Sequence, residues 1–174
     1  MDTTKSVREI LEDVNDTNTV DINTVEAIIW SHHHFDHTGD VSTFPPSTDL
    51  IVGPGVTESL LPGYPDSPNS TLLKSDYTNR NLMELDFTST TGTKNNFKTF
   101  TTLQVGQFPA IDYFNDGSFY LLNTPGHALG HICGLARVTC EDASPGSKNS
   151  FILLAGDAFH HVGEIRPSNW LRQC

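Results

Sequence analysis

The spacing of apolar residues at the start of the chain predicts a helix followed by a strand. Four apolar residues recur at helical spacing, namely Val7, Ile10, Leu11 and Val14. They predict an amphipathic helix over residues 4–15. After a polar stretch, the β-branched run over residues 25–31 predicts a short buried strand. A helix, a strand and then a polar loop are typical of α/β layer folds.

The remainder of the chain predicts mainly loops and further strands. Residues 45–80 are rich in Pro, Ser, Gly and Asp, so we expect a loop with a short strand at 50–52 and one helical turn at 56–61. Residues 88–96 and 140–150 are predicted loops. Further strands are predicted at 81–87, 97–107, 118–123, 132–138 and 151–155. With neither an internal repeat nor a linker, residues 1–174 are expected to form one domain.

Charge and composition exclude several classes of partner. The 174 residues carry 21 acidic and 10 basic side chains, a net charge of -11, which disfavours nucleic acid and anionic membranes. No apolar run is long enough to span a bilayer, and the N-terminus lacks a secretory apolar segment, so we expect a cytoplasmic protein. Three cysteines without a Cys-x-x-Cys pair, Cys133, Cys140 and Cys174, favour reduced thiols over disulfides or a zinc ribbon.

The histidines are grouped in a way that scattered surface polarity does not explain. The 89 residues between His37 and His127 contain none. All eight fall into three clusters: His32, His33, His34 and His37; His127 and His131; His160 and His161.

The first cluster follows the predicted buried strand directly. If the extended chain continues through it, His32 and His34 point to the same side and can meet one metal ion, while His33 points away. Asp36 and His37 follow a change of direction and can serve a second ion nearby. Imidazole and carboxylate donors without thiolate favour a catalytic site for zinc, iron or manganese. A polar surface loop or an artificial histidine tract is the alternative, and it fits an internal motif after a strand poorly.

The other two clusters also lie at predicted strand ends. Pro125-Gly126 makes a tight turn that can present His127, and the strand at 151–155 ends in Gly156-Asp157. Either feature alone favours an ordinary turn or strand end. Three such features in one chain together favour a ligand site, because ligands collect at the carboxyl ends of strands in α/β folds.

Three motifs in this order resemble the pattern of the metallo-β-lactamase superfamily. They are His-x-His-x-Asp-His at 32–37, Thr-Pro-Gly-His-x-x-Gly-His at 124–131 and Gly-Asp at 156–157. The wording of the first motif is most similar to lactonase-like members, and residues 157–167 are similar to fungal members. The resemblance spans roughly residues 25–167.

This resemblance implies an α/β fold, the αββα sandwich, with a metal pair at one edge of its two sheets. It implies that one ion is held by His32, His34 and His127, and the second by Asp36 and His37, with Asp157 bridging both. His131 matches a position that supports the loop, and His33 matches a variable position. The implied cofactor is Zn²⁺, two ions per complete site, with iron or manganese as alternatives.

The implied activity is hydrolysis of a small-molecule lactone or lactam. A metal-bound hydroxide would attack the carbonyl carbon of the cyclic ester or amide. Asp36 and Asp157 are the expected catalytic carboxylates, which orient the metals and handle the proton.

The chain departs from the family pattern at both ends. The family supplies one more histidine well downstream of the bridging aspartate, and here none follows His161. His160 or His161 could substitute, but their short distance from Asp157 favours surface or supporting roles. The usual strands before the first helix are also missing, so we expect an incomplete sandwich, truncated at both ends, whose exposed sheet a homo-oligomer would cover.

Two alternatives to the hydrolase remain open. The first is an inactive or partially active metal-binding remnant of such an enzyme. The second is a thioester hydrolase or dioxygenase of the glyoxalase type, against which the presence of both Asp36 and His37 argues.

Overall fold

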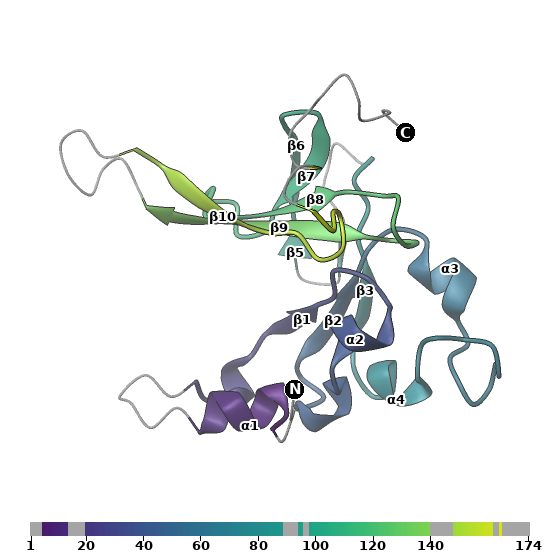
Figure 1. Ribbon diagram of the computed structural model, residues 1–174. Helices are drawn as coiled ribbons and strands as arrows, with labels where there is room; N and C mark the ends of the chain where they lie inside the picture. The colour runs from purple at the N-terminus through teal and green to yellow at the C-terminus, as the bar shows by residue number, and fades with distance from the viewer. Residues whose placement is uncertain are drawn as a thin grey trace.

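The computed structural model describes residues 5–13, 20–88, 94–95, 98–139, 148–161 and 164. Within these ranges the chain forms two principal β-sheets, one above the other in Figure 1. The smaller sheet is parallel, with strand order β1-β2-β3. Its strands are β1 (Ala27–Ile29), β2 (Asp49–Val52) and β3 (Leu82–Glu84).

The larger sheet is antiparallel, with strand order β10-β9-β8-β7-β6. Its strands are β6 (Thr101–Val105), β7 (Phe108–Asp112), β8 (Phe119–Asn123), β9 (Ile132–Thr139) and β10 (Ser150–Leu154). A separate antiparallel pair consists of β4 (Lys94–Asn95) and β5 (Lys98–Thr99). The chain therefore combines a parallel layer and an antiparallel layer, as the α/β sandwich class requires.

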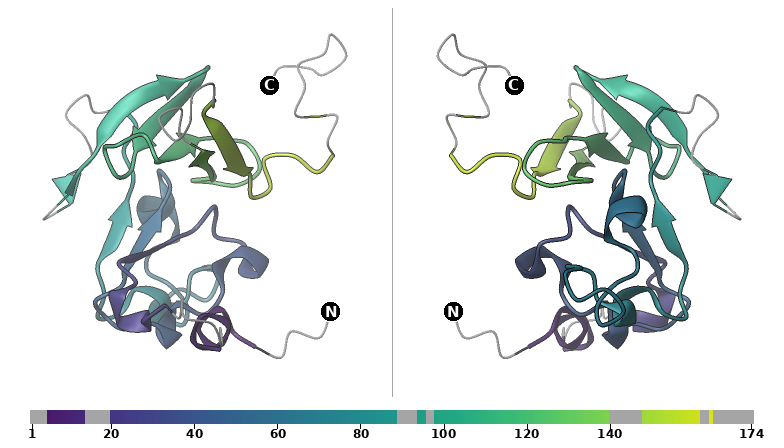
Figure 2. Two further views of the ribbon diagram at one scale, coloured as in Figure 1. Left: turned by 90° about the vertical axis from the view of Figure 1, so that its left-hand side faces the viewer. Right: turned by 90° about the vertical axis from the view of Figure 1, so that its right-hand side faces the viewer.

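Two short helices, α1 (Val7–Glu12) and η1 (Ile22–Thr24), precede the parallel sheet. Others occupy its connections, because parallel strands need crossovers; they are α2 (Phe35–Thr38), η2 (Val41–Thr43), α3 (Val56–Leu60) and α4 (Lys74–Tyr77). Helix α1 begins with a capping box in which Ser6 and Glu9 bond each other's backbone N–H. Helices α1 and α4 lie at the end of the molecule remote from the antiparallel sheet (Figure 2). None of the helices in the described ranges is long and apolar enough to cross a membrane.

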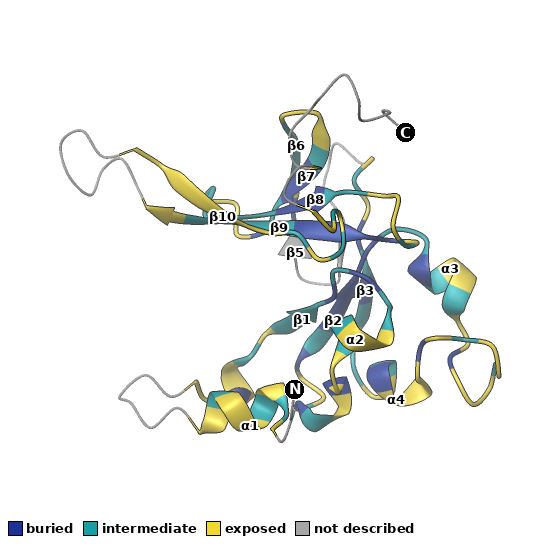
Figure 3. Cartoon of the chain, viewed as in Figure 1, coloured by how far each residue is buried: buried dark blue, intermediate teal, exposed yellow. Residues whose placement is uncertain are grey.

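The main apolar core lies between the two sheets, where buried strands are dark blue in Figure 3. Ile51 and Met83 from the parallel sheet meet Ile111, Leu121 and Ile132 from the antiparallel sheet. Side chains alternate along β2, so its other residues serve a second core on the opposite face of the parallel sheet. That second core contains Trp30, Val41, Leu50, Val52, Val56 and Leu72.

The edge strand β10 is apolar and exposed along its whole length. Phe151, Ile152, Leu153 and Leu154 are between 42% and 54% exposed. Such an edge offers both unpaired backbone groups and apolar side chains for association. The expectation of an exposed sheet is thus met within the described residues, while its covering by a homo-oligomer stays a prediction.

Most predicted strands are present, but the sequence-based picture needs several corrections. Strands predicted at 118–123, 132–138 and 151–155 lie within a residue or two of β8, β9 and β10. Part of the predicted helix 4–15 and of the loop 140–150 lies outside the described residues. The prediction of a loop throughout 88–96 is wrong at β4, and a single strand over 97–107 is wrong because β5 and β6 pair with different strands. Strand β7 and helices α2 and α4 were not predicted.

Candidate metal centre

Three histidines of the first cluster, His32, His33 and His34, lie in the loop between β1 and α2, and the fourth, His37, lies in α2. Strand β1 ends at Ile29, so the extended chain does not continue through the cluster as expected. Instead the loop is closed by the indole N–H of Trp30, which donates to the carbonyl of Thr38 at 2.9 Å. The bend brings His32 and His34 together, with Nε2 of His32 3.0 Å from Nδ1 of His34.

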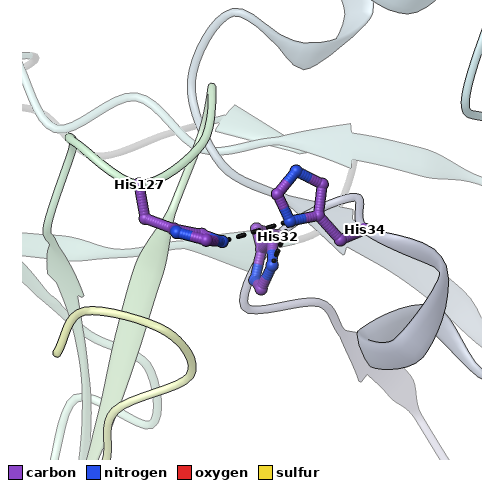
Figure 4. A group of neighbouring side chains, drawn as sticks. All are labelled: His32, His34 and His127. Atoms are coloured by element: carbon purple, nitrogen blue, oxygen red, sulfur yellow. Dashed lines mark hydrogen bonds between the residues drawn. The ribbon is translucent and has the colours of Figure 1, made fainter. Parts of the chain in front are cut away.

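The loop between β8 and β9 brings a third imidazole to this pair. Nε2 of His127 lies 3.1 Å from Nδ1 of His34, as Figure 4 shows. The three rings contribute ligand atoms that all lie within 4.8 Å of one another. The set predicted for the first ion, His32, His34 and His127, is therefore assembled from segments far apart in the sequence.

Asp157, which follows β10, faces two sets of histidines with its two carboxylate oxygens. Its Oδ1 lies 3.1 Å from Nε2 of His37. Its Oδ2 lies 3.4 Å from Nε2 of His127 and 4.0 Å from Nε2 of His32. His32, His37 and Asp157 form a second group of potential ligands. Because one nitrogen lone pair binds one ion, His32 can serve either group but not both at once.

A fully buried histidine holds Asp157 in place. The backbone N–H of Asp157 donates to Nε2 of His131 at 3.1 Å. With Nε2 accepting, the proton of the neutral ring is on Nδ1, which lies 3.0 Å from the carbonyl oxygen of Thr124. His131 therefore links the start of the β8–β9 loop to the end of β10, in agreement with the supporting role that the resemblance implies.

Gly156 is required at the end of β10 for two physical reasons. Its φ of +52° lies in the left-handed region. A Cβ there would lie 2.9 Å from Nε2 of His131 and 2.9 Å from Cβ of Ser31. Only glycine combines this backbone conformation with this close approach, which directs Asp157 towards the histidines.

Burial favours the neutral form of two imidazoles at the centre, those of His32 and His131. Burial and the nearby rings of His37 and His34 lower the pKa of His32 to about 4. Burial also lowers the pKa of His131. Neutral imidazoles and a carboxylate are the protonation states in which these groups bind a cation. The donor chemistry and the close N···N contacts thus fit a divalent metal ion.

The remaining candidate residues lie in different places. Asp36 belongs to no ligand group among the described residues, although its Oδ2 lies 3.7 Å from Nε2 of His37. Its side chain is 58% exposed. His33 belongs to no ligand group among the described residues; its Nδ1 lies 2.9 Å from Oγ1 of Thr71, and its ring centroid lies 5.2 Å from that of His34. His160, for which the sequence favoured a surface or supporting role, forms a third ligand group with His127 and Asp157.

Two cavities border the centre. One of about 680 Å³ has His127 in its wall, together with apolar side chains that include Phe108, Leu122, Leu153 and Phe159. A second of about 410 Å³ has His37 in its wall and extends between the sheets beside β1. Cavities of this size are typical of small-molecule sites.

Imidazoles and a carboxylate gathered where two sheets meet are the arrangement of a metal-dependent protein of the α/β class. The chain belongs to the metallo-beta-lactamase superfamily, whose family model matches residues 16–172. Membership of this superfamily implies binding of a divalent metal ion.

Three curated relatives are similar over most of this chain. The "Gamma-lactamase FDB1" of Fusarium pseudograminearum is 46% identical over 168 residues, which are 97% of this chain and 36% of that protein. The "Gamma-lactamase MBL2" of Gibberella moniliformis is 47% identical over 144 residues, 83% of this chain and 54% of that protein. The "Cytochrome P450 monooxygenase mpaDE" of Penicillium roqueforti is 49% identical over 147 residues, 84% of this chain and 16% of that protein.

The chain therefore spans between about a sixth and about a half of the length of these three relatives. No solved structure matches it significantly.

Proposed function

We propose that this chain belongs to a metal-dependent hydrolase that opens a cyclic amide or ester, with a γ-lactam as the first substrate to test. The observation that carries the proposal is the convergence of three imidazoles, His32, His34 and His127, beside the carboxylate of Asp157. The two relatives named gamma-lactamases support the choice of substrate class.

The proposed cofactor is Zn²⁺, two ions per site, with iron or manganese as alternatives. His32, His34 and His127 would hold one ion. His37 and Asp157 would hold the second with Asp36, and Asp157 would bridge the two. The bridging role is supported by the two oxygens of Asp157, since one faces His37 and the other faces His127. For Asp36 the support is its position next to His37.

The proposed chemistry divides between the ion and the side chains of this chain. A divalent ion supplies hydroxide at neutral pH, because it lowers the pKa of coordinated water from about 16 towards 7. Asp157, held through its backbone by His131, keeps its carboxylate fixed between the two histidine groups. Asp36 is exposed at the rim, where a carboxylate can exchange a proton with solvent and with the departing nitrogen or alkoxide.

The larger cavity supports a substrate with an apolar substituent. Its apolar side chains would exclude water from that substituent, and His127 in its wall would keep the cyclic carbonyl near the ligand groups. A compact ring with an aromatic or alkyl group is therefore a better first substrate than a charged one.

The proposal is tested by measuring the metal content of the purified 174-residue protein together with its hydrolysis of a γ-lactam, a chromogenic β-lactam and a lactone. We expect two ions per chain and turnover of at least one of these compounds. A protein that takes up no metal would refute the proposal. Metal uptake without turnover of any of the three would favour the non-enzymatic remnant.

The assignment of ligands is tested with two neighbouring histidines. His34→Ala should remove the more tightly bound ion, because His34 contacts both other rings of its group. His33→Ala is the matched control, since His33 faces Thr71 and belongs to no ligand group within the described ranges. Unchanged metal stoichiometry in His34→Ala would contradict the assignment.

A further inference from the structure

After β10, the carboxylate of Glu164 contacts the backbone of two adjacent histidines, His160 and His161. Oε2 of Glu164 accepts hydrogen bonds from the backbone N–H of His160 at 2.8 Å and of His161 at 3.4 Å. The backbone N–H of Glu164 in turn donates to the carbonyl of His161 at 2.8 Å. These backbone hydrogen bonds lower the pKa of Glu164, so it is ionised at neutral pH and the turn is closed by a charge-assisted contact.

This turn brings the side chain of His160 over His127. The two ring centroids are 5.7 Å apart with an interplanar angle of 61°. A ligand atom of His160 lies within 4.8 Å of ligand atoms of both His127 and Asp157. His160 therefore reaches the ligand atoms of His127 and Asp157, although its short separation in sequence from Asp157 had argued against a role as a ligand.

The donor set around His160 is chemically complete for a catalytic metal ion. Two imidazoles and one carboxylate form one of the three-ligand sets of catalytic zinc, which leave a coordination position open for water or substrate. His160 is exposed and therefore lies on the solvent side of the centre. Asp36 is exposed too, but it belongs to no ligand group among the described residues. The next residue, His161, belongs to no such group in the part of the chain that is described.

We propose that His160 is a metal ligand that acts together with His127 and Asp157 on the open side of the centre. The proposal rests on the metal-dependent function proposed above and adds a ligand to it. Glu164 is its positioning residue, because the carboxylate fixes the backbone from which His160 projects.

The test is a zinc titration of the metal-free, full 174-residue protein by calorimetry, repeated with Co²⁺ and followed by visible absorption. His160→Ala should weaken binding of the ion that His127 holds by at least about 10-fold and change the Co²⁺ spectrum. His161→Ala is the matched control, because it removes an adjacent histidine, and it should bind both ions as the unmodified protein does. Thermal unfolding checks that both variants are folded.

Two outcomes separate this proposal from the proposed function. If His160→Ala and His161→Ala both bind zinc and Co²⁺ as the unmodified protein does, while His34→Ala loses an ion, His160 is not a ligand and the metal centre stands. If the unmodified protein binds neither metal, the proposed function fails and the assignment of His160 fails with it. An equal loss in His160→Ala and His161→Ala also overturns the assignment, because it shows no preference for His160.

Discussion

The closest backbone approach at the metal centre gives the sharpest test of how the two sheets are held together. Gly53, directly after β2, is buried against Gly130 in the β8–β9 loop, the loop that carries His127 and His131. A Cβ on Gly53 would lie 1.9 Å from the carbonyl oxygen and 2.6 Å from the carbonyl carbon of Gly130. Both atoms are backbone, so no side-chain rotation can relieve the clash. Gly53→Ala must therefore displace the loop by roughly 1.5–2 Å, the gap between this approach and an ordinary contact of about 3.5–4 Å.

The size of the effect follows from that displacement. Overpacking of a close-packed interior costs about 1–3 kcal/mol, and two backbone segments with no freedom to rotate favour the upper end. For a chain of this length, about 3 kcal/mol corresponds to a fall in Tm of roughly 6–12 °C. Because the displaced loop carries His127, zinc affinity should also fall, by about 10- to 100-fold, as when a group that supports a metal ligand is lost.

Thermal unfolding and zinc titration of Gly53→Ala measure both effects. Gly106→Ala is the control, since Gly106 lies in the turn between β6 and β7 with open space around it and a φ of +61°. It should lose about 1 kcal/mol from backbone strain and keep its zinc affinity. A Gly53→Ala protein that melts within about 2 °C of the unmodified protein and binds zinc equally well would show that the approach of Gly53 to Gly130 does not position the loop.

Three further predictions concern single side chains. Arg80→Ala should lower the free energy of unfolding in urea by about 3 kcal/mol, because the guanidinium donates to four carbonyls within residues 41–48, and Arg80→Lys should recover only part of this. His131→Gln should weaken zinc binding about 10-fold in a titration, because the shorter amide cannot reach both Thr124 and Asp157. In the metal-free protein the pKa of His32 is lowered to about 4, so the folded state binds fewer protons than the unfolded state between pH 6.5 and 4. Urea unfolding should therefore show that stability falls as the pH is lowered through that window, and that it falls less steeply in His32→Gln.

The sequence predicted the strands that carry the site better than the elements between them. The β-branched run at 25–31 contains β1, and the apolar run at 151–155 overlaps β10, although β10 is an exposed edge strand and not a buried one. Strand β7 was missed since it contains Pro109, and proline argues against a position inside a sheet. Helices α2 and α4 have four residues each, too few for helical periodicity to appear.

The residues of the candidate ligand groups could be predicted, while their exact grouping could not. The spacing within 32–37 indicated which histidines lie together. The expected cause, a strand that continues through them, was wrong, because β1 ends at Ile29 and the chain then bends in a loop that Trp30 closes. The position of His160 depends on a turn closed by Glu164, and the approach of Gly53 depends on a loop more than seventy residues away. Contacts of this kind arise from tertiary packing, which local sequence patterns do not encode.

The ligands of the centre come from both sheets, so metal binding and the docking of the sheets must depend on each other. His32, His34 and His37 follow the parallel sheet, whereas His127 and Asp157 follow strands of the antiparallel sheet. Beneath them the backbone N–H of Ile132 donates to the carbonyl of Ser31 at 2.8 Å, which joins the two halves directly. An ion that binds only the docked state adds about 2.7 kcal/mol of stability when its free concentration is 100 times its Kd. Chelation should therefore lower the Tm of the unmodified protein by more than it lowers that of Gly53→Ala, in which docking is already disturbed. Equal shifts in the two proteins would mean that the ion is held by one half alone.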